Sequence, residues 1–192
     1  MAKFVSVVIV VLFCPLIAWA QATPETYRVP EAYEIYATLL PEQWPVTEAH
    51  TKKLIIRAET ASYDMCLKPE GESIAIVGPA IANFLEVNKK TWLLEKAIPM
   101  DLSYEFLFQK ELHAIFANGP GGWKSFYERY PNSGGYNEVS AVGFNADKTV
   151  AVVYVGHSCG GLCGGGSFHV LQKKEGKWQE LNWKGSQCMW VS

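Results

Sequence analysis

The residues best suited to chemistry stand in one short stretch, "HSCGGLCGGG" at positions 157–166. The stretch holds two cysteines, one histidine and five glycines, and a second histidine, His169, follows shortly after it. Thiolates and imidazoles bind metal ions, paired thiols form disulfides or redox centres, and consecutive glycines can turn backbone N–H groups toward an anion. The stretch therefore admits four interpretations, which are a disulfide, a metal site, a redox pair and an anion site.

The first twenty residues have the pattern of a leader for export. Lys3 precedes an apolar run over 4–17, and an A-x-A cleavage site follows at 18–20. The apolar run is short for a bilayer span, and no basic cluster follows it. We expect residues 1–20 to be a signal peptide cut after Ala20. The mature protein would then be periplasmic or secreted, with no membrane span.

Cleavage would remove Cys14 and leave four cysteines, which are Cys66, Cys159, Cys163 and Cys188. An even number in an exported protein favours disulfides, and four cysteines can pair in three ways. The local choice joins Cys159 to Cys163 and therefore Cys66 to Cys188, and the glycines allow the positive φ that so short a loop requires. We expect a glycine-rich hairpin loop closed by the first pair. The second pair would stabilise the fold by about 4 kcal/mol in the chain-entropy description.

Binding of zinc or copper is the sharper alternative. If residue 157 lies opposite about 167 in an antiparallel pair, His157 and His169 share one face of the sheet near the loop. Together with Cys159 and Cys163 they would supply two imidazoles and two thiolates, a suitable tetrahedral ligand set for zinc. A slip of one residue in the register would move His169 to the opposite face. The metal hypothesis stays open beside the disulfide, which would need no cofactor.

The redox and anion interpretations have less support. Redox pairs usually have the spacing C-x-x-C at a helix start, whereas the spacing here is C-x-x-x-C between two predicted strands. The glycines at 164–166 do not match a phosphate-binding loop, and no helical pattern follows them. We therefore rank both below the disulfide and the metal site.

No catalytic motif can be read from the sequence. Ser158 and Ser167 lie near the two histidines, but no G-x-S-x-G turn and no separately placed acid accompanies them. His113 in "KELHAIF" lacks the second histidine of an H-E-x-x-H metalloprotease motif. A hydrolase remains a third hypothesis, with a site assembled from residues that are distant in the sequence.

The hydrophobic pattern predicts a single α+β domain over residues 21–192. Helices are expected at 30–40, 79–94, 111–116 and 123–130, with a loop at 67–79. Strands are expected at 53–60, 103–109, 137–144, 149–157, 167–173 and 177–183. Because helices come early and the last four strands have short connections, we expect helices packed on an antiparallel sheet with a C-terminal four-stranded meander.

Composition argues against two classes of partner. Removing Lys3 with the leader lowers the Lys and Arg count from 17 to 16 against 19 acidic residues, so the mature formal charge is −3. A nearly neutral surface has no electrostatic footprint for nucleic acid or an anionic membrane. The chain is 49% hydrophobic and 19% charged, which predicts a compact fold rather than disorder.

A block of residues in the C-terminal third carries a family resemblance. It includes "VGFN" (142–145), "VVY" (152–154), "CGGLCGGG" (159–166) and "KKEGKWQ" (173–179). In these segments the chain resembles a group of secreted bacterial proteins of unknown function. The resemblance implies a shared fold over roughly residues 123–183 and implies no activity.

Taken together, the sequence predicts an exported protein that is a non-catalytic binding or structural module for an unknown ligand. The alternatives are a metal-binding protein that uses His157, Cys159, Cys163 and His169, and a hydrolase of unidentified site.

Overall fold

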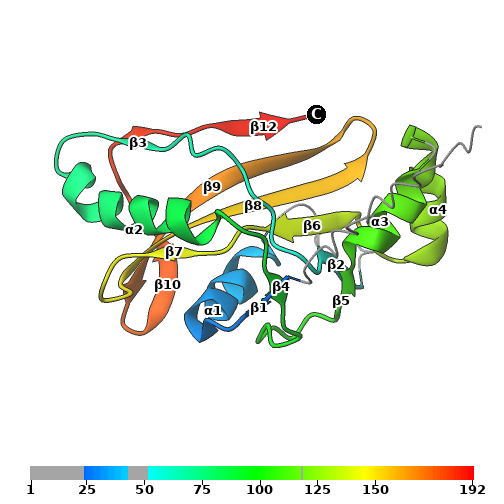
Figure 1. Ribbon diagram of the computed structural model, residues 1–192, viewed down its shortest axis with the longest axis horizontal. Coiled ribbons are helices and arrows are strands. Elements are labelled where there is room, and N and C mark those ends of the chain that lie inside the picture. The colour runs from blue at the N-terminus through cyan, green and yellow to red at the C-terminus, as the bar shows by residue number, and fades with distance from the viewer. Residues whose placement is uncertain (1–23, 43–51, 118) are drawn as a thin grey trace, which may run out of the picture.

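The structure, a computed structural model, describes residues 24–42, 52–117 and 119–192. The predicted signal peptide and its cleavage site lie outside these residues. The described part has an α+β fold in which helices pack on both faces of one large sheet (Figure 1). No helix in this part of the chain is long and apolar enough to cross a membrane.

The large sheet has the strand order β10-β9-β8-β6-β2-β5, with β7 paired to β8 and β12 paired to β9. Its strands are β2 (Leu54–Arg57), β5 (Tyr104–Leu107), β6 (Tyr136–Val139), β7 (Gly143–Phe144), β8 (Val150–Gly160), β9 (Cys163–Lys174), β10 (Lys177–Glu180) and β12 (Met189–Val191). Two smaller pairs join β1 (Thr26–Tyr27) to β4 (Leu93–Leu94), and β3 (Lys68–Pro69) to β11 (Gly185–Ser186).

The predicted C-terminal meander is confirmed, but the sheet as a whole is mixed. β6 and β7 both pair antiparallel with β8, which pairs with β9, which pairs with β10. β2, however, runs parallel to both β5 and β6. The expectation of an antiparallel sheet is therefore wrong for these strands. Each follows β2 through a long connection that contains helices, and such a connection can return the chain in the same direction.

The two faces of the sheet carry different helices. α1 (Pro30–Leu39) packs against one face through Ile35, Tyr36 and Leu39, all buried. α2 (Ser73–Val87) covers one end of the other face, and α3 (Gln109–Phe116) and α4 (Gly122–Arg129) cover its opposite end (Figure 1). A short 3-10 helix, Gly119–Gly121, joins α3 to α4. We call the first face the α1 face and the second the α2 face.

α2 begins six residues earlier than predicted and contains Pro79 in its interior. The expected loop at 67–79 and helix at 79–94 are therefore wrong in their bounds. Proline removes one helix hydrogen bond, but Pro79 is exposed, so water can satisfy the freed carbonyl. Val77, Ala80 and Phe84 bury the opposite side of the helix against the sheet, which favours continuing the helix through the proline.

The cysteine–glycine stretch lies in the β8–β9 hairpin and is mostly paired strand. β8 extends to Gly160 and β9 begins at Cys163, so only Gly161 and Leu162 form the turn. His157 lies opposite Gly165, and His169 lies opposite Val153. The predicted register was two residues out. Because a shift of two preserves the side-chain alternation, both histidines do share the α1 face, but they lie four residue pairs apart along the strands.

Candidate functional site

Both expected disulfides are present. Cys159 is bonded to Cys163 at the hairpin tip with a Cα–Cα distance of 5.0 Å. Cys66 is bonded to Cys188 with a Cα–Cα distance of 5.9 Å and a sequence separation of 122. The long pair fastens the C-terminal segment, which includes β12, to the segment that precedes α2. β12 then lies along β9 beside the glycines of the hairpin.

A run of glycines lets aromatic and polar groups approach the hairpin closely on the α2 face. Gly166 pairs with Gly156, and a Cβ at Gly166 would come within 2.6 Å of Trp190 Nε1 and closer still to the Tyr154 hydroxyl. Trp190 Nε1 donates a hydrogen bond of 2.6 Å to that hydroxyl. The glycines therefore make room for the residues that β12 brings, and they are not a flexible loop.

The four residues of the alternative metal set are not brought together as ligands. Cys159 and Cys163 are bonded to each other, and His169 lies four residue pairs away from His157 along the strands. Within the described residues, no three His, Cys, Asp or Glu side chains gather in a group that could hold a metal ion. The disulfide consumes the thiolates on which that ligand set depended.

His157 is a buried imidazole, 5% exposed, fixed by Asn137 on the neighbouring strand. Its Nδ1 lies 3.1 Å from Asn137 Oδ1, and Nε2 has no hydrogen-bond partner among the described residues. Burial lowers the pKa of His157, an effect that the carbonyl of Gly134 partly opposes. The ring is therefore held in its neutral form near pH 7.

His169 belongs to a different arrangement, which sequence reasoning missed. Its Nε2 lies 3.2 Å from Ser167 Oγ, and its Nδ1 lies 2.6 Å from Glu180 Oε1. Glu180 is the separately placed acid that the sequence did not reveal. It comes from β10, where it pairs with Leu171 and so lies diagonally across from His169. The tight turn at Glu175-Gly176 was the sequence signal that could have revealed this contact, because the turn sets the β9–β10 register.

A small hollow of about 170 Å³ adjoins Ser167. Strand alternation places His157, Gly165, Ser167, Met189 and Val191 on the α1 face, and all five line this hollow. Gly164, Gly166 and Trp190 complete its lining. Met189 and Val191 are mostly exposed, so the hollow opens to solvent at the edge formed by β12. We call it the Ser167 hollow.

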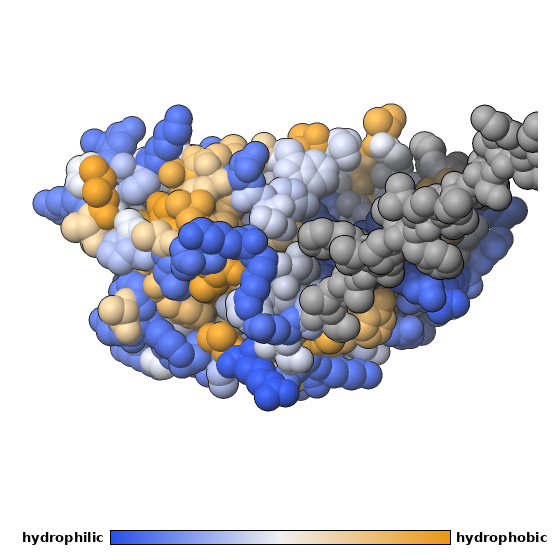
Figure 2. All heavy atoms as spheres, in the orientation of Figure 1, coloured by the Kyte–Doolittle hydropathy of each residue, from blue (hydrophilic) through white to orange (hydrophobic). Residues whose placement is uncertain are grey.

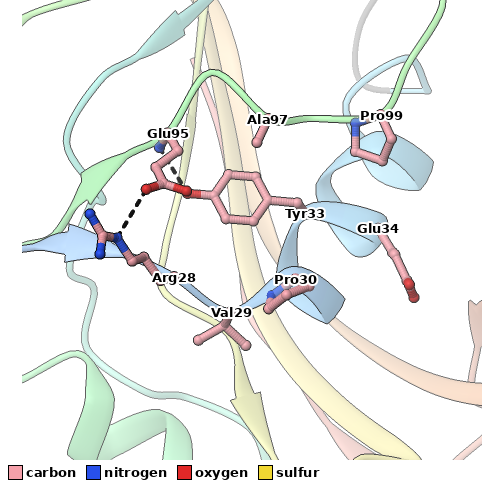
Figure 3. Close-up of a pocket in the computed structure, with 8 residues that line it drawn as sticks. All are labelled: Arg28, Val29, Pro30, Tyr33, Glu34, Glu95, Ala97 and Pro99. Atoms are coloured by element: carbon pink, nitrogen blue, oxygen red, sulfur yellow. Dashed lines mark hydrogen bonds and ion pairs between the residues drawn. The ribbon is translucent and has the colours of Figure 1, made fainter.

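Two larger hollows lie on either side of Arg28 and Val29, the residues between β1 and α1. One, of about 380 Å³, is lined by Arg28, Val29, Pro30, Tyr33, Glu34, Glu95, Ala97 and Pro99 (Figure 3). We call it the Tyr33 hollow. Figure 3 shows the Tyr33 ring between the two proline-bearing segments, its hydroxyl held by the backbone N–H of Glu95 at 2.8 Å. Arg28 Nε donates to Glu95 at 3.1 Å at the rim.

The other hollow, of about 560 Å³, we call the Trp92 hollow. It is lined by Thr26, Tyr27, Arg28, Val29, Asn83, Val87, Trp92, Val142, Phe144, Asn145, Ala146 and Lys148. Two cations, Arg28 and Lys148, are in this lining, and no carboxylate is. The rings of Tyr27 and Trp92 stand 5.7 Å apart between their centres. The hollow thus combines apolar and aromatic walls with positive charge.

A buried ionic network occupies the α2 face between α2 and the α3–α4 pair. Arg57 Nη1 donates to Glu138 Oε2 at 3.0 Å, and the Tyr63 hydroxyl donates a very short hydrogen bond to the other carboxylate oxygen. The Tyr63 ring stacks on Tyr154 with 3.7 Å between centres. Burial and the Glu138 carboxylate raise the pKa of Tyr63, so the hydroxyl keeps its proton and remains a donor.

The aromatic side of α4 serves mainly as core, as its spacing indicates. Phe126 and Tyr130 are buried with Ile55 and Leu107, whereas Tyr127 lies at the surface and donates to the carbonyl of Cys159 at 2.7 Å. α4 therefore supports the hairpin tip rather than presenting rings to a ligand.

Elsewhere on the α2 face, exposed apolar residues of α2 include Ile74, Ile76 and Leu85 (Figure 2).

Comparisons with protein-family models, with curated proteins and with solved structures find no match to this chain.

Proposed function

We propose that this chain is an exported, disulfide-stabilised binding module that holds a small amphipathic anion in the Trp92 hollow. The lining of that hollow carries the proposal, because it includes two cations and no carboxylate around an apolar interior. Its volume lies within the usual range for small-molecule sites, which also combine mostly apolar walls with a few placed polar groups.

The two cations at the hollow can still bind an anion, because each uses only some of its N–H groups to bind a carboxylate of the protein. Arg28 binds Glu95 through Nε, and its side chain is 77% exposed, so the guanidinium can offer its outer nitrogens to a carboxylate or sulfonate. Lys148 binds Glu31 at 2.9 Å, and an ammonium has three protons to donate. The anionic end of a ligand would accept hydrogen bonds from the remaining N–H groups of Arg28 and Lys148.

The apolar part of the ligand would lie against Trp92, Tyr27 and Val87. Trp92 Nε1 donates to the carbonyl of Val87 at 2.8 Å, and the Tyr27 hydroxyl both donates to and accepts from Val142. These bonds fix both rings before a ligand arrives, which reduces the entropy lost on binding. A flat apolar group is therefore the best match for these walls.

Binding can be tested with 1-anilinonaphthalene-8-sulfonate, an aromatic sulfonate whose fluorescence rises in apolar surroundings. We expect saturable binding to the mature protein, weakened at least tenfold by the double variant Arg28→Gln/Lys148→Gln and also weakened by Trp92→Ala. The matched control is Lys177→Gln/Lys184→Gln, which removes two cations elsewhere and should bind as the wild type does. Absence of saturable binding, or equal binding by the first double variant, would refute the proposal.

Export rests on the leader pattern and is supported by the two disulfides, which persist in oxidising compartments. The full chain should be recovered from the periplasm or medium of a bacterial host with Gln21 as its first residue. Intact mass and N-terminal sequencing measure this directly. Recovery of the uncut chain from the cytoplasm would show that residues 1–20 are not a signal peptide.

A further inference from the structure

Ser167, His169 and Glu180 form a hydrogen-bonded chain, and the neutral form of the histidine ring fixes the direction of both bonds. A carboxylate only accepts, so His169 Nδ1 donates to Glu180 Oε1. When the ring is neutral, its lone pair is then on Nε2, where it can accept the proton of the Ser167 hydroxyl. This is the polarity that a serine nucleophile needs, because the base must accept the hydroxyl proton as the oxygen attacks.

The sheet holds these three groups in place. Ser167 and His169 are two residues apart on β9, so both project from the α1 face, and Glu180 projects from the same face of β10. The side chain of His169 is only 16% exposed, whereas that of Glu180 is 59% exposed. The ring is therefore confined by its neighbours, and the acid that orients it lies at the surface.

The Ser167 hollow gives the nucleophile a place for a substrate. Its floor is the glycine segment 164–166, which presents backbone and no side chains, and its walls include Met189 and Val191. A volume of about 170 Å³ accommodates a short acyl group. The carbonyl carbon of such a group, lying over Gly165, would be next to Ser167 on the same face.

We infer that Ser167, His169 and Glu180 form a nucleophilic site that cleaves small aryl esters, a function separate from ligand binding in the Trp92 hollow. Ser167 Oγ bonds to the acyl carbon while its proton passes to His169 Nε2, and the bond from carbon to the aryl oxygen breaks. The phenol leaves with that proton. Water then bonds to the acyl carbon, gives a proton to His169, and the ester bond to Ser167 breaks as Oγ takes the proton back. The products are one carboxylic acid and one phenol.

The position of Ser167 in the sheet limits the leaving groups that the site can expel. Ser167 is paired with β8 on one side and β12 on the other, so its backbone N–H lies in the plane of the sheet and does not point into the hollow. Stabilisation of the developing oxyanion by such a donor is usually worth about 10²–10³ in rate. Activated aryl esters depend least on it, and amides depend on it strongly. The site should therefore act on aryl acetates and not on peptides.

A fluorophosphonate probe tests the nucleophile without requiring turnover. Ser167 Oγ would bond to phosphorus and fluoride would leave, which adds the mass of the phosphonyl group to the peptide that contains Ser167. Peptide mapping of the labelled mature protein should place this mass on Ser167. A label on any other residue, or no label after prolonged exposure to the probe, overturns the inference. Because the mapping uses wild-type protein, it does not depend on whether a variant folds.

Hydrolysis of p-nitrophenyl acetate tests the roles of the three residues. Ser167→Ala and His169→Gln should each lower the rate at least about 100-fold, because general-base catalysis usually contributes 10²–10⁴. Glu180→Gln should lower it at least tenfold through the orientation of the ring. Ser158→Ala is the matched control, since Ser158 lies on the same hairpin but on the opposite face, and it should retain the wild-type rate. Equal rates for Ser167→Ala and wild type, at equal urea midpoints, would contradict the assignment.

Discussion

Gly143 lies directly against the backbone of Phe84, where β7 meets α2. A Cβ at position 143 would stand 2.5 Å from the carbonyl oxygen of Ala80 and closer still to the amide nitrogen of Phe84. Asn83 accepts a hydrogen bond of 2.8 Å from the backbone of Phe144 at the same contact. The absence of a side chain at Gly143 is therefore what allows α2 to pack so closely on the sheet.

Substitution of Gly143 should destabilise the protein strongly. The atoms that a new methyl group would meet are backbone, which cannot move aside as a flexible side chain can, so we expect Gly143→Ala to lower the free energy of unfolding by about 3 kcal/mol. Urea denaturation measures this. Gly161→Ala is the control, because a Cβ there meets no atom within 4 Å, and its effect should stay within about 0.5 kcal/mol. Equal stabilities of the two variants would disprove the contact.

Removing one partner of the Arg57–Glu138 pair should lower the free energy of unfolding strongly, whereas replacing both partners with apolar residues should lower it much less. Glu138→Leu leaves a largely buried guanidinium without its carboxylate, and we expect a loss of about 3 kcal/mol. In the double variant Arg57→Met/Glu138→Leu no charge is left unpaired, so most of that loss should be regained. The urea midpoints of the single and the double variant measure this difference in stability. If the double variant were less stable than Glu138→Leu, the pair would not be the dominant interaction.

The two disulfides should differ in their contribution to stability. In the chain-entropy description, the benefit grows with the length of the closed loop, and the separations here are 122 and 4 residues. Cys66→Ala/Cys188→Ala should lower the free energy of unfolding by about 4–5 kcal/mol, and Cys159→Ala/Cys163→Ala by about 2 kcal/mol. Denaturation of both variants under the same non-reducing conditions gives the comparison. The reverse order would mean that the tip disulfide has a role in native packing that its short loop does not predict.

The thiol state also separates the disulfide from the metal hypothesis. Mature protein denatured without reductant should react with iodoacetamide at none of its four cysteines. Its thermal midpoint should be the same before and after dialysis against EDTA, because the metal ligand set would need the thiolates of Cys159 and Cys163. Two alkylated cysteines together with a midpoint lowered by EDTA would favour zinc over the tip disulfide.

Local patterns were sufficient for much of this fold. Pro30 and the apolar spacing after it specify α1, and the short turns between strands specify the meander. Each of these two signals is local, because the residues that form it lie close together in the sequence. The pairing of the cysteines was also accessible, because few alternatives exist for four of them. The parallel pairing of β2 with β5 and β6 was not, since the composition of a strand does not identify its neighbours.

The candidate sites were harder to predict because they depend on register and on distant segments. Glu180 meets His169 only through the β9–β10 register, and the Trp92 hollow joins residues near positions 28, 92 and 148. The glycine run conceals its strand structure, since glycine shows no alternation of apolar and polar side chains. Pro79 misled the prediction of α2 for a related reason, because only packing against the sheet shows that the helix continues through it.

The buried imidazole of His157 should make stability depend on pH in the acid range. Burial holds its folded-state pKa below the unfolded value of about 6.5. As pH falls below the unfolded pKa, the unfolded chain takes up a proton that the folded protein does not. The stability from neutral His157 is therefore fully present above about pH 6.5 and is lost as pH falls toward the folded pKa.

Comparison with a variant that cannot titrate isolates this effect. We expect the free energy of unfolding of the wild type to decrease between pH 7.5 and pH 5, with at most about 1.4 kcal/mol per pH unit arising from this one group. His157→Phe keeps a buried ring but takes up no proton, so its stability should fall less over the same range. Urea denaturation at constant ionic strength gives both profiles. Parallel profiles would show that His157 becomes protonated as readily in the folded protein as in the unfolded chain.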